Sequence, residues 1–298
     1  MPLAAFPKCY LDSLTEGEMS VDEWIEIASG LDVDGIEFYW GFTPADDPDE
    51  LDRIATLADE RGLAIPMMCY SPDFTRPTAE GRREEVREQR RAIDATARLG
   101  GGYCRVLSGQ RRPEVAYEEG LDRVAECIHE LLPYAAEREV TLILENHYKD
   151  DFWEYPEFAQ QQEAFLDLLD RIEESPWFGV NYDPSNAVIA GDDPIDLLRA
   201  VADRVVTMHA SDRYLEGGTL EDLRAMEDDA HEGYADILEH GVVGEGMIDY
   251  DEVFSILAAA GFEGWISIED GYDPEVGVEH LAQSARFLRE KMAAHDLP

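Results

Sequence analysis

Short apolar runs alternate with longer amphipathic segments along the whole chain. The apolar runs have the length of strands, and the segments between them show the apolar spacing of helices that are covered on one face. Eight strands are predicted, at 6–10, 35–40, 64–70, 103–108, 141–147, 178–183, 205–211 and 265–270. Eight helices are predicted between and after them, at 21–30, 48–61, 78–99, 115–137, 158–174, 194–202, 250–260 and 276–293.

Residues at the segment ends agree with these boundaries. Ser20 can cap the first helix, Asp193 followed by Pro194 opens another, and glycines close three, at Gly62, Gly100 and Gly261. Alternating strands and helices predict a parallel sheet, and eight such units in 298 residues favour one (β/α)8 TIM barrel, a single α/β domain over 1–298. An open doubly wound sheet is the alternative, but no glycine-rich dinucleotide-binding loop follows the first strand.

One connection is unusually long. It runs from about 212 to 249, after the seventh predicted strand. Long connections in compact folds are commonly functional loops or small insertions. Because it follows the carboxyl end of a strand, we expect it to lie beside the active face of the barrel.

Composition restricts the class of protein. Hydrophobic residues make up 45% of the chain, enough to bury a sizeable core. No apolar run reaches the roughly 18 residues that a membrane-spanning helix needs. The first residues lack the pattern of a secretory signal, and the four cysteines form no C-x-x-C pair. These features predict a cytoplasmic protein with free thiols and no contact with a membrane.

The charge is strongly negative and is distributed along the whole chain. The net charge is −43, from 67 acidic and 24 basic residues, and the only lysines are Lys8, Lys149 and Lys291. Such a chain is a poor ligand for nucleic acid, which is bound by neutralising phosphates. An acidic surface for a partner is one interpretation. We favour a halophile's protein, because salt shortens the Debye length to roughly 3 Å at 1 M and makes the self-repulsion tolerable.

Four polar residues share the inward-facing parity near the ends of the last four predicted strands. They are Glu145, Asp183, His209 and Glu269. A single acid at a strand end is more often a cap or a solvated loop residue, but the same parity in four strands indicates a shared site. Three crowded carboxylates would raise one another's pKa unless a cation neutralised them. Three oxygen donors and one imidazole suit Mn²⁺, Mg²⁺, Co²⁺ or Zn²⁺.

Five motifs carry a family resemblance. They are LENH at 144–147, NYDPSN at 181–186, HASD at 209–212, GEGMIDY at 244–250 and GWISIED at 264–270. Together they resemble the xylose-isomerase-like barrels, which include sugar isomerases and epimerases, inosose dehydratases and abasic-site endonucleases. The resemblance covers the chain from about Cys9 to the end. It implies one divalent ion, Mn²⁺ before the others, held by Glu145, Asp183, His209 and Glu269, with the two glutamates also acting as acid and base.

The resemblance leaves several activities open. The first is a sugar isomerase or epimerase that transfers a proton through an enediolate. A dehydratase or lyase on inosose or keto-sugars would use the same ion, and a non-catalytic sugar-binding barrel is the alternative from another class. Asn186 stands where related ketose epimerases often carry His, and Asp151 stands where they carry Glu. The additional histidines of the endonucleases are missing at the ends of the third and fourth strands.

Other polar residues are candidates for substrate contact: His147, Asn186, Arg213, Glu37 and Arg105. For His147 a structural hydrogen bond is an equal alternative. For Arg105 a pair with a barrel carboxylate such as Glu37 is favoured. We expect a small sugar as the partner, unphosphorylated because no lysine-rich phosphate grip is visible, and a dimer or tetramer is possible by analogy with the family.

Overall fold

The computed structural model describes residues 1–43, 47–150, 152–227, 237–271, 273–295 and 297. At its centre lies a nine-stranded sheet in the order β2-β1-β11-β8-β7-β6-β5-β4-β3, with every neighbouring pair parallel. The strands are β1 (Leu3–Ala5), β2 (Gly35–Ile36), β3 (Phe38–Tyr39), β4 (Met67–Cys69), β5 (Tyr103–Val106), β6 (Thr141–Glu145), β7 (Phe178–Tyr182), β8 (Val205–Ala210) and β11 (Trp265–Ile268).

The two edges of this sheet meet in one short segment. β2 pairs with β1, β3 pairs with β4, and both belong to residues 35–39. The predicted strand at 35–40 is therefore divided at Glu37, and the sheet curls into a nearly closed barrel. The TIM-barrel fold predicted from the alternation of strands and helices is confirmed.

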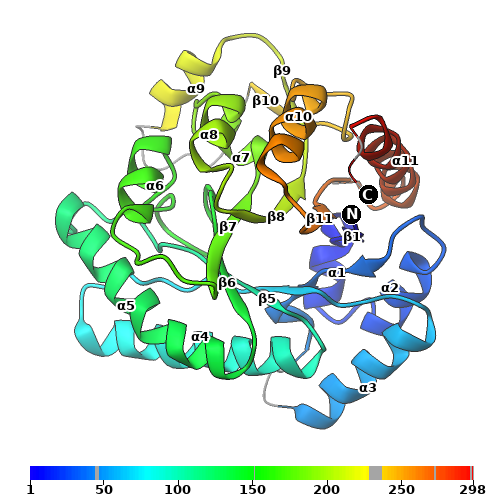
Figure 1. The fold of residues 1–298 in the computed structure, drawn as a ribbon, viewed down its shortest axis with the longest axis horizontal. Helices are drawn as coiled ribbons and strands as arrows, with labels where there is room; N and C mark the ends of the chain where they lie inside the picture. The colour runs from blue at the N-terminus through cyan, green and yellow to red at the C-terminus, as the bar shows by residue number, and fades with distance from the viewer. Residues whose placement is uncertain (44–46, 151, 228–236, 272, 296, 298) are drawn as a thin grey trace.

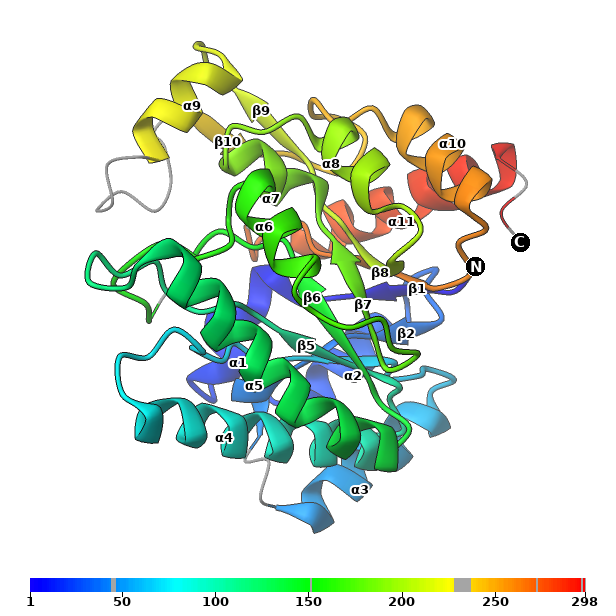
Figure 2. The ribbon, with the colours of Figure 1, turned by 60° about the vertical axis from the view of Figure 1, so that its left-hand side comes forward.

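Helices surround the barrel (Figures 1 and 2). They are α1 (Leu11–Thr15), α2 (Val21–Ala28), α3 (Pro48–Glu60), α4 (Ala79–Arg98), α5 (Tyr117–Glu137), α6 (Gln162–Leu169), α7 (Pro184–Ile189), α8 (Pro194–Val201), α10 (Tyr250–Ala260) and α11 (Gly277–Ala294), with short 3-10 turns η1 (Lys8–Tyr10) and η2 (Trp40–Phe42). In α5, Leu121, Val124, Ile128 and Leu131 recur at helical spacing and are fully buried, so one face of this helix packs into the core.

The predicted helix boundaries rest on local chemistry that the structure displays. Ser20 and Glu23 form a reciprocal capping box at the start of α2. The Asp193 side chain accepts hydrogen bonds from two backbone amides at the start of α8. Gly261 takes a left-handed conformation after α10, with φ 73°, which a side chain would disfavour.

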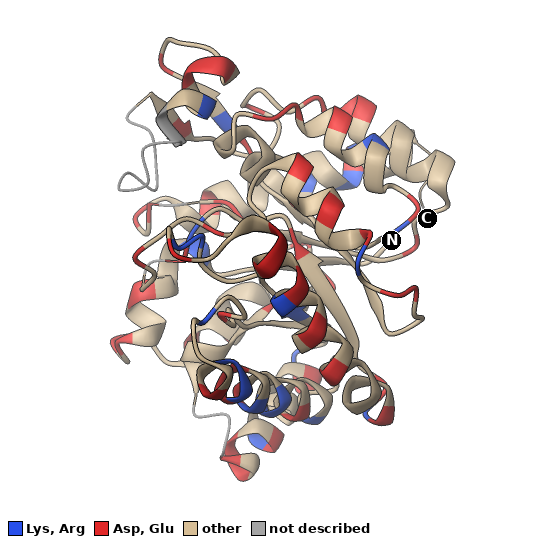
Figure 3. Ribbon diagram, turned by 90° about the vertical axis from the view of Figure 1, so that its left-hand side faces the viewer, with Lys and Arg blue, Asp and Glu red and all other residues tan. Residues whose placement is uncertain are grey.

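The acidic residues are spread over the helices around the barrel and do not form one patch in the view of Figure 3. A dispersed distribution is what the sequence pattern indicated. The interpretation as a halophile's protein stays a prediction.

The first predicted strand, at 6–10, is wrong. The strand is β1, three residues earlier, and Lys8–Tyr10 form a 3-10 turn after Pro7. β1 is fully buried and reads Leu-Ala-Ala, so it lacks both the alternation and the branched residues that mark a strand in a sequence. The consequence is that Lys8 lies beyond the strand, at the mouth of the barrel.

Two further elements differ from the prediction. α6 covers only part of the predicted helix at 158–174, because the backbone amides of Phe158 and Ala159 bond to Gly109 and Ser108 instead of continuing a helix. α7 was not predicted, although Asp183 followed by Pro184 is a helix-start signal. The long connection contains β9 (Arg213–Leu215), α9 (Leu220–Glu227) and β10 (Leu238–His240), and β9 pairs antiparallel with β10.

Within the part of the chain that the structure describes, no helix is long and apolar enough to cross a membrane. The four cysteines are buried free thiols, in agreement with the expectation from their spacing.

Candidate metal centre

The strand ends bring the four predicted ligands together. Glu145 ends β6, Asp183 follows β7, His209 lies in β8 and Glu269 follows β11. One donor atom from each of the four lies within 4.8 Å of the others. The Nδ1 atom of His209 is 2.7 Å from Glu269 Oε2, 3.1 Å from Glu145 Oε1 and 3.9 Å from Asp183 Oδ2. A single imidazole nitrogen therefore faces three carboxylates.

Asp183 is held with one oxygen turned towards this group. Its Oδ1 accepts hydrogen bonds from the backbone amides of Ser185 and Asn186 and from the hydroxyls of Ser185 and Ser211, at 2.7 to 3.1 Å. Oδ2 is the oxygen that faces His209. The start of α7 thus fixes Asp183 in an orientation that suits a ligand donating through one oxygen.

The side chain of Asn146 joins the ends of β6 and β7. Its Nδ2 donates to the carbonyl oxygen of Asp183 at 2.6 Å, and its Oδ1 accepts from the Asp183 amide at 2.9 Å. This double hydrogen bond sets the spacing between Glu145 and Asp183. Asn146 itself comes directly after β6, which ends at Glu145.

Glu145 is fully buried and is held by two donors. Arg105 Nη1 lies 2.9 Å from its Oε2, and Asn186 Nδ2 lies 3.1 Å from its Oε1. Burial alone would raise the pKa of Glu145, but the charges of His209 and Arg105 lower it to about 2. The carboxylate is therefore ionised and ready to act as a ligand.

Glu269 is the member of this group that reaches solvent, with 14% of its side chain exposed. Lys8 Nζ donates to its Oε1 at 2.8 Å. Burial would raise the pKa of Glu269, but Lys8 and His209 hold it well below its usual range. Lys8 was not among the site residues predicted from the sequence. The signal that could have found it is the rarity of lysine, which occurs three times in the chain.

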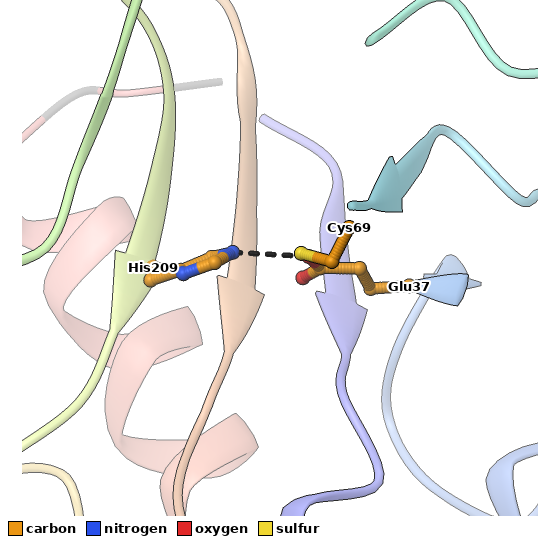
Figure 4. A group of neighbouring side chains, drawn as sticks. All are labelled: Glu37, Cys69 and His209. Carbon is orange, nitrogen blue, oxygen red and sulfur yellow. Dashed lines mark hydrogen bonds and ion pairs between the residues drawn. The ribbon is translucent and has the colours of Figure 1, made fainter. Parts of the chain in front are cut away.

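The other nitrogen of His209 is also occupied. Nε2 lies 3.0 Å from Glu37 Oε1, and the Cys69 thiol donates to the same oxygen at 2.6 Å. Figure 4 shows these three side chains together. Burial alone would lower the pKa of His209, but Glu37, Glu145 and Glu269 raise it well above the ordinary value. Glu37 lies at the break between β2 and β3, so closure of the barrel is what places it beneath the imidazole.

The donor set fits a divalent ion. Burial together with the charges of Glu269 and Glu145 raises the pKa of Asp183, the sign of carboxylates crowded without enough positive charge. A dication between these oxygens and Nδ1 would remove that repulsion. A metal-binding imidazole commonly donates its other N–H to a carboxylate, and Glu37 stands in that position.

A cavity of about 420 Å³ opens beside Glu269. Its lining includes Phe6, Lys8, Tyr39, Arg105, His147 and Glu269. This size is in the range of pockets that take small molecules. The cavity therefore gives a substrate access to Glu269.

The predicted substrate contacts fall into two groups. Arg105 and His147 line the cavity, and His147 Nδ1 also lies 3.3 Å from the buried Glu157 Oε2. Glu37, Asn186 and Arg213 are buried, and none belongs to the described lining of this cavity. Glu37 lies against His209, Asn186 against Glu145, and Arg213 Nη1 donates to the Asp212 carbonyl.

Two details differ from the sequence-based expectations. The favoured pair of Arg105 with a barrel carboxylate exists, but its partner is Glu145 and not Glu37. Arg213 lies in the connection predicted as a long loop, but it belongs to β9 and only 3% of it is exposed. Asp151, named for its departure from the ketose epimerases, lies outside the described residues.

Known proteins share this fold. A curated inosose dehydratase from Bacillus thuringiensis is 25% identical over 182 residues, which cover 58% of this chain and 55% of the relative. The match thus spans about half the length of that relative. Two solved structures are similar to this chain. One is a D-tagatose 3-epimerase-like protein, with a TM-score of 0.76 and 20% identity, covering 99% of this chain and 98% of its own. The other is an IOLI protein with a binding zinc atom, with a TM-score of 0.71 and 17% identity, also covering 99% of this chain and 98% of its own.

At such identities the solved structures establish the fold alone. A family model described as "Xylose isomerase-like TIM barrel" matches residues 25–291. The chain therefore belongs to the xylose isomerase-like TIM barrel family.

Proposed function

We propose that this protein is a divalent-metal-dependent sugar isomerase or epimerase that works by proton transfer. The observation that carries the proposal is the position of Glu269. It faces the same imidazole nitrogen as Glu145 and Asp183, and it alone of the four lines the cavity. An ionised carboxylate at the boundary between a metal centre and a substrate cavity is placed to act as a base.

Glu145, Asp183, His209 and Glu269 would hold the ion. When bound, a divalent ion polarises a carbonyl and the hydroxyl on the neighbouring carbon, which acidifies the C–H of that hydroxyl-bearing carbon. Mn²⁺ is our first expectation. Mg²⁺, Co²⁺ and Zn²⁺ are alternatives, because these ions also accept mixed oxygen and nitrogen ligands.

The two glutamates then have distinct tasks. Glu269 accepts the proton from the substrate carbon, and Lys8 keeps this carboxylate ionised and oriented by its hydrogen bond to Oε1. Glu145 acts as the second acid–base group, held in place by Arg105 and Asn186. Return of the proton to the neighbouring carbon gives an isomer, and return to the opposite face gives an epimer.

Isotope exchange tests this proposal on many sugars in parallel. The metal-loaded protein is incubated with a panel of ketoses and aldoses in D₂O and the products are analysed by mass. We expect deuterium at the carbon beside the carbonyl, and we expect Glu269→Gln to abolish the exchange while retaining the fold. Glu263→Gln, an exposed glutamate just before β11, is the matched control. Full exchange in Glu269→Gln would overturn the acid–base assignment.

A dehydratase is the second candidate, supported by the 25% identity to inosose dehydratase. The same base would remove the proton, and a β-hydroxyl would leave instead of the proton returning. The product would then be lighter by one water, which the same mass analysis detects.

A further inference from the structure

We infer that the substrate carries an anionic group, a carboxylate or a phosphate, which Lys8 and Lys149 bind. The chain contains three lysines, and two of them line the cavity beside the candidate metal centre. This inference rests on the proposed function, because it assigns a substrate class to the same site. The sequence alone favoured an unphosphorylated sugar, and a phosphate as the anionic group would replace that expectation.

The charge of the cavity differs from that of the rest of the molecule. Acidic residues outnumber basic ones by 67 to 24 in the whole chain. Among the described residues, the cavity lining contains three acids and three bases, and His147 in addition. The six are Lys8, Arg105, Lys149, Asp12, Asp150 and Glu269. A strongly acidic protein thus presents a balanced cavity, where an anion would meet far less repulsion than elsewhere on the surface.

A bound ion would shift this balance further. The positive charges of Lys8 and Arg105 are opposed by Glu269 and Glu145, at 2.8 and 2.9 Å. If both glutamates also bind a dication, their charge is shared with it, and the two cations face the cavity with less opposition. The loaded site is then more positive than the site without the ion, which reduces the repulsion that an anionic substrate would meet.

A lysine side chain is also well suited to bind an anionic group of a substrate. An ammonium group has three donors, and Lys8 Nζ directs one of them to Glu269 Oε1. Its flexible stem lets it follow a ligand, whereas the guanidinium of Arg105 is fixed by Glu145, Ser71 and the Tyr70 carbonyl. Asp12 and Asp150 would accept hydrogen bonds from hydroxyl groups, so a polyhydroxylated acid or phosphate fits the lining.

Binding of matched polyols tests the inference. The probes are sorbitol, gluconate and sorbitol 6-phosphate, titrated calorimetrically into the metal-loaded full-length protein at one fixed salt concentration. We expect one anionic probe to bind about tenfold more tightly than sorbitol, the gain of a charge-assisted hydrogen bond. The preferred probe identifies the anionic group.

Lysine variants separate this effect from direct binding of the anion to the metal. Lys149→Gln should reduce the preference for the anion about five- to tenfold while leaving sorbitol binding unchanged. Lys8→Gln should reduce the same preference, measured as the ratio of anion to sorbitol affinity in that variant. Lys291→Gln, which removes the third lysine from its pair with Asp251 on α10, is the matched control. Equal binding of all three probes, no binding of either anion, or a preference that survives both cavity variants would overturn the inference.

The metal content of each preparation is measured at the same time. A protein that binds no ion but keeps a lysine-dependent preference for anions would contradict the proposed function and retain this inference. A protein that binds one ion per chain but shows no preference for anions would contradict this inference and leave the proposed function standing.

Discussion

Glu37 Oε1 lies 3.0 Å from Nε2 of His209, on the opposite side of the imidazole from the three carboxylates that face Nδ1. The two residues come from distant parts of the chain and are both fully buried. When His209 donates its Nε2–H to Glu37 and binds an ion, Nδ1 is the nitrogen that would supply the lone pair. The role of Glu37 is to position a ligand.

Replacing Glu37 with Gln should weaken metal binding. The substitution retains the size of the side chain but removes the charge that orients His209, and loss of such an outer carboxylate commonly costs about 10- to 100-fold in affinity. Calorimetric titration with Mn²⁺ measures the change, with Glu60→Gln on the exposed end of α3 as the control. Affinity equal to that of the wild type would show that Glu37 has no part in positioning His209.

Asp212 should be important for stability. Its two carboxylate oxygens accept backbone amides from Arg213, Gly244, Gly246 and Ile248 at 2.9 to 3.1 Å, and so anchor the 244–250 motif. Asp212→Ala would leave four buried or half-buried amides without their acceptor. We expect a loss of about 2–4 kcal/mol in the free energy of unfolding, and a smaller loss for Asp212→Asn, which keeps one acceptor oxygen. Denaturant unfolding measures both, and an unchanged midpoint for the alanine variant would contradict this role.

His240 should make the protein sensitive to acid. Burial, together with the positive charges of Arg213 and Lys8, lowers the pKa of His240 to about 3. A histidine in the unfolded chain has a pKa of about 6.5. Below that pH the unfolded state therefore binds a proton at this residue, whereas the folded state does not. The stability contribution of neutral His240 is therefore complete above about pH 6.5 and falls as the pH drops towards 3.

Thermal unfolding at a series of pH values tests the role of His240. The variant His240→Gln should lose less of its melting temperature between about pH 7 and about pH 4 than the wild type does. His280→Gln on α11 controls for the removal of one histidine. If the His240 variant and the wild type lose the same amount, this histidine is not the source of acid sensitivity.

The alternation of apolar segments was sufficient to predict the barrel, and the parity of residues within strands was sufficient to group Glu145, Asp183, His209 and Glu269. Parity works here because side chains of one strand alternate strictly while the strand lasts. It gave no indication that Asn146, which lies just beyond the end of β6, joins two strand ends.

Other features depend on contacts that no local pattern contains. The pair of Glu37 and His209 exists because the barrel closes at the break between β2 and β3. Lys8 reaches Glu269 because the chain turns at Pro7, which the apolar run at 6–10 concealed. Closure of the barrel places Glu37, whereas the turn after β1, beside β11, places Lys8.

Metal content is the most direct measurement of the central claim. The protein is purified in high salt, and bound ions are counted in the wild type and in Glu145→Gln. We predict about one divalent ion per chain in the wild type, Mn²⁺ or one of its alternatives, and loss of that ion in the variant. A wild-type protein that contains no such ion, and takes up neither Mn²⁺ nor Mg²⁺, would contradict the four-residue site and favour a sugar-binding barrel without catalysis.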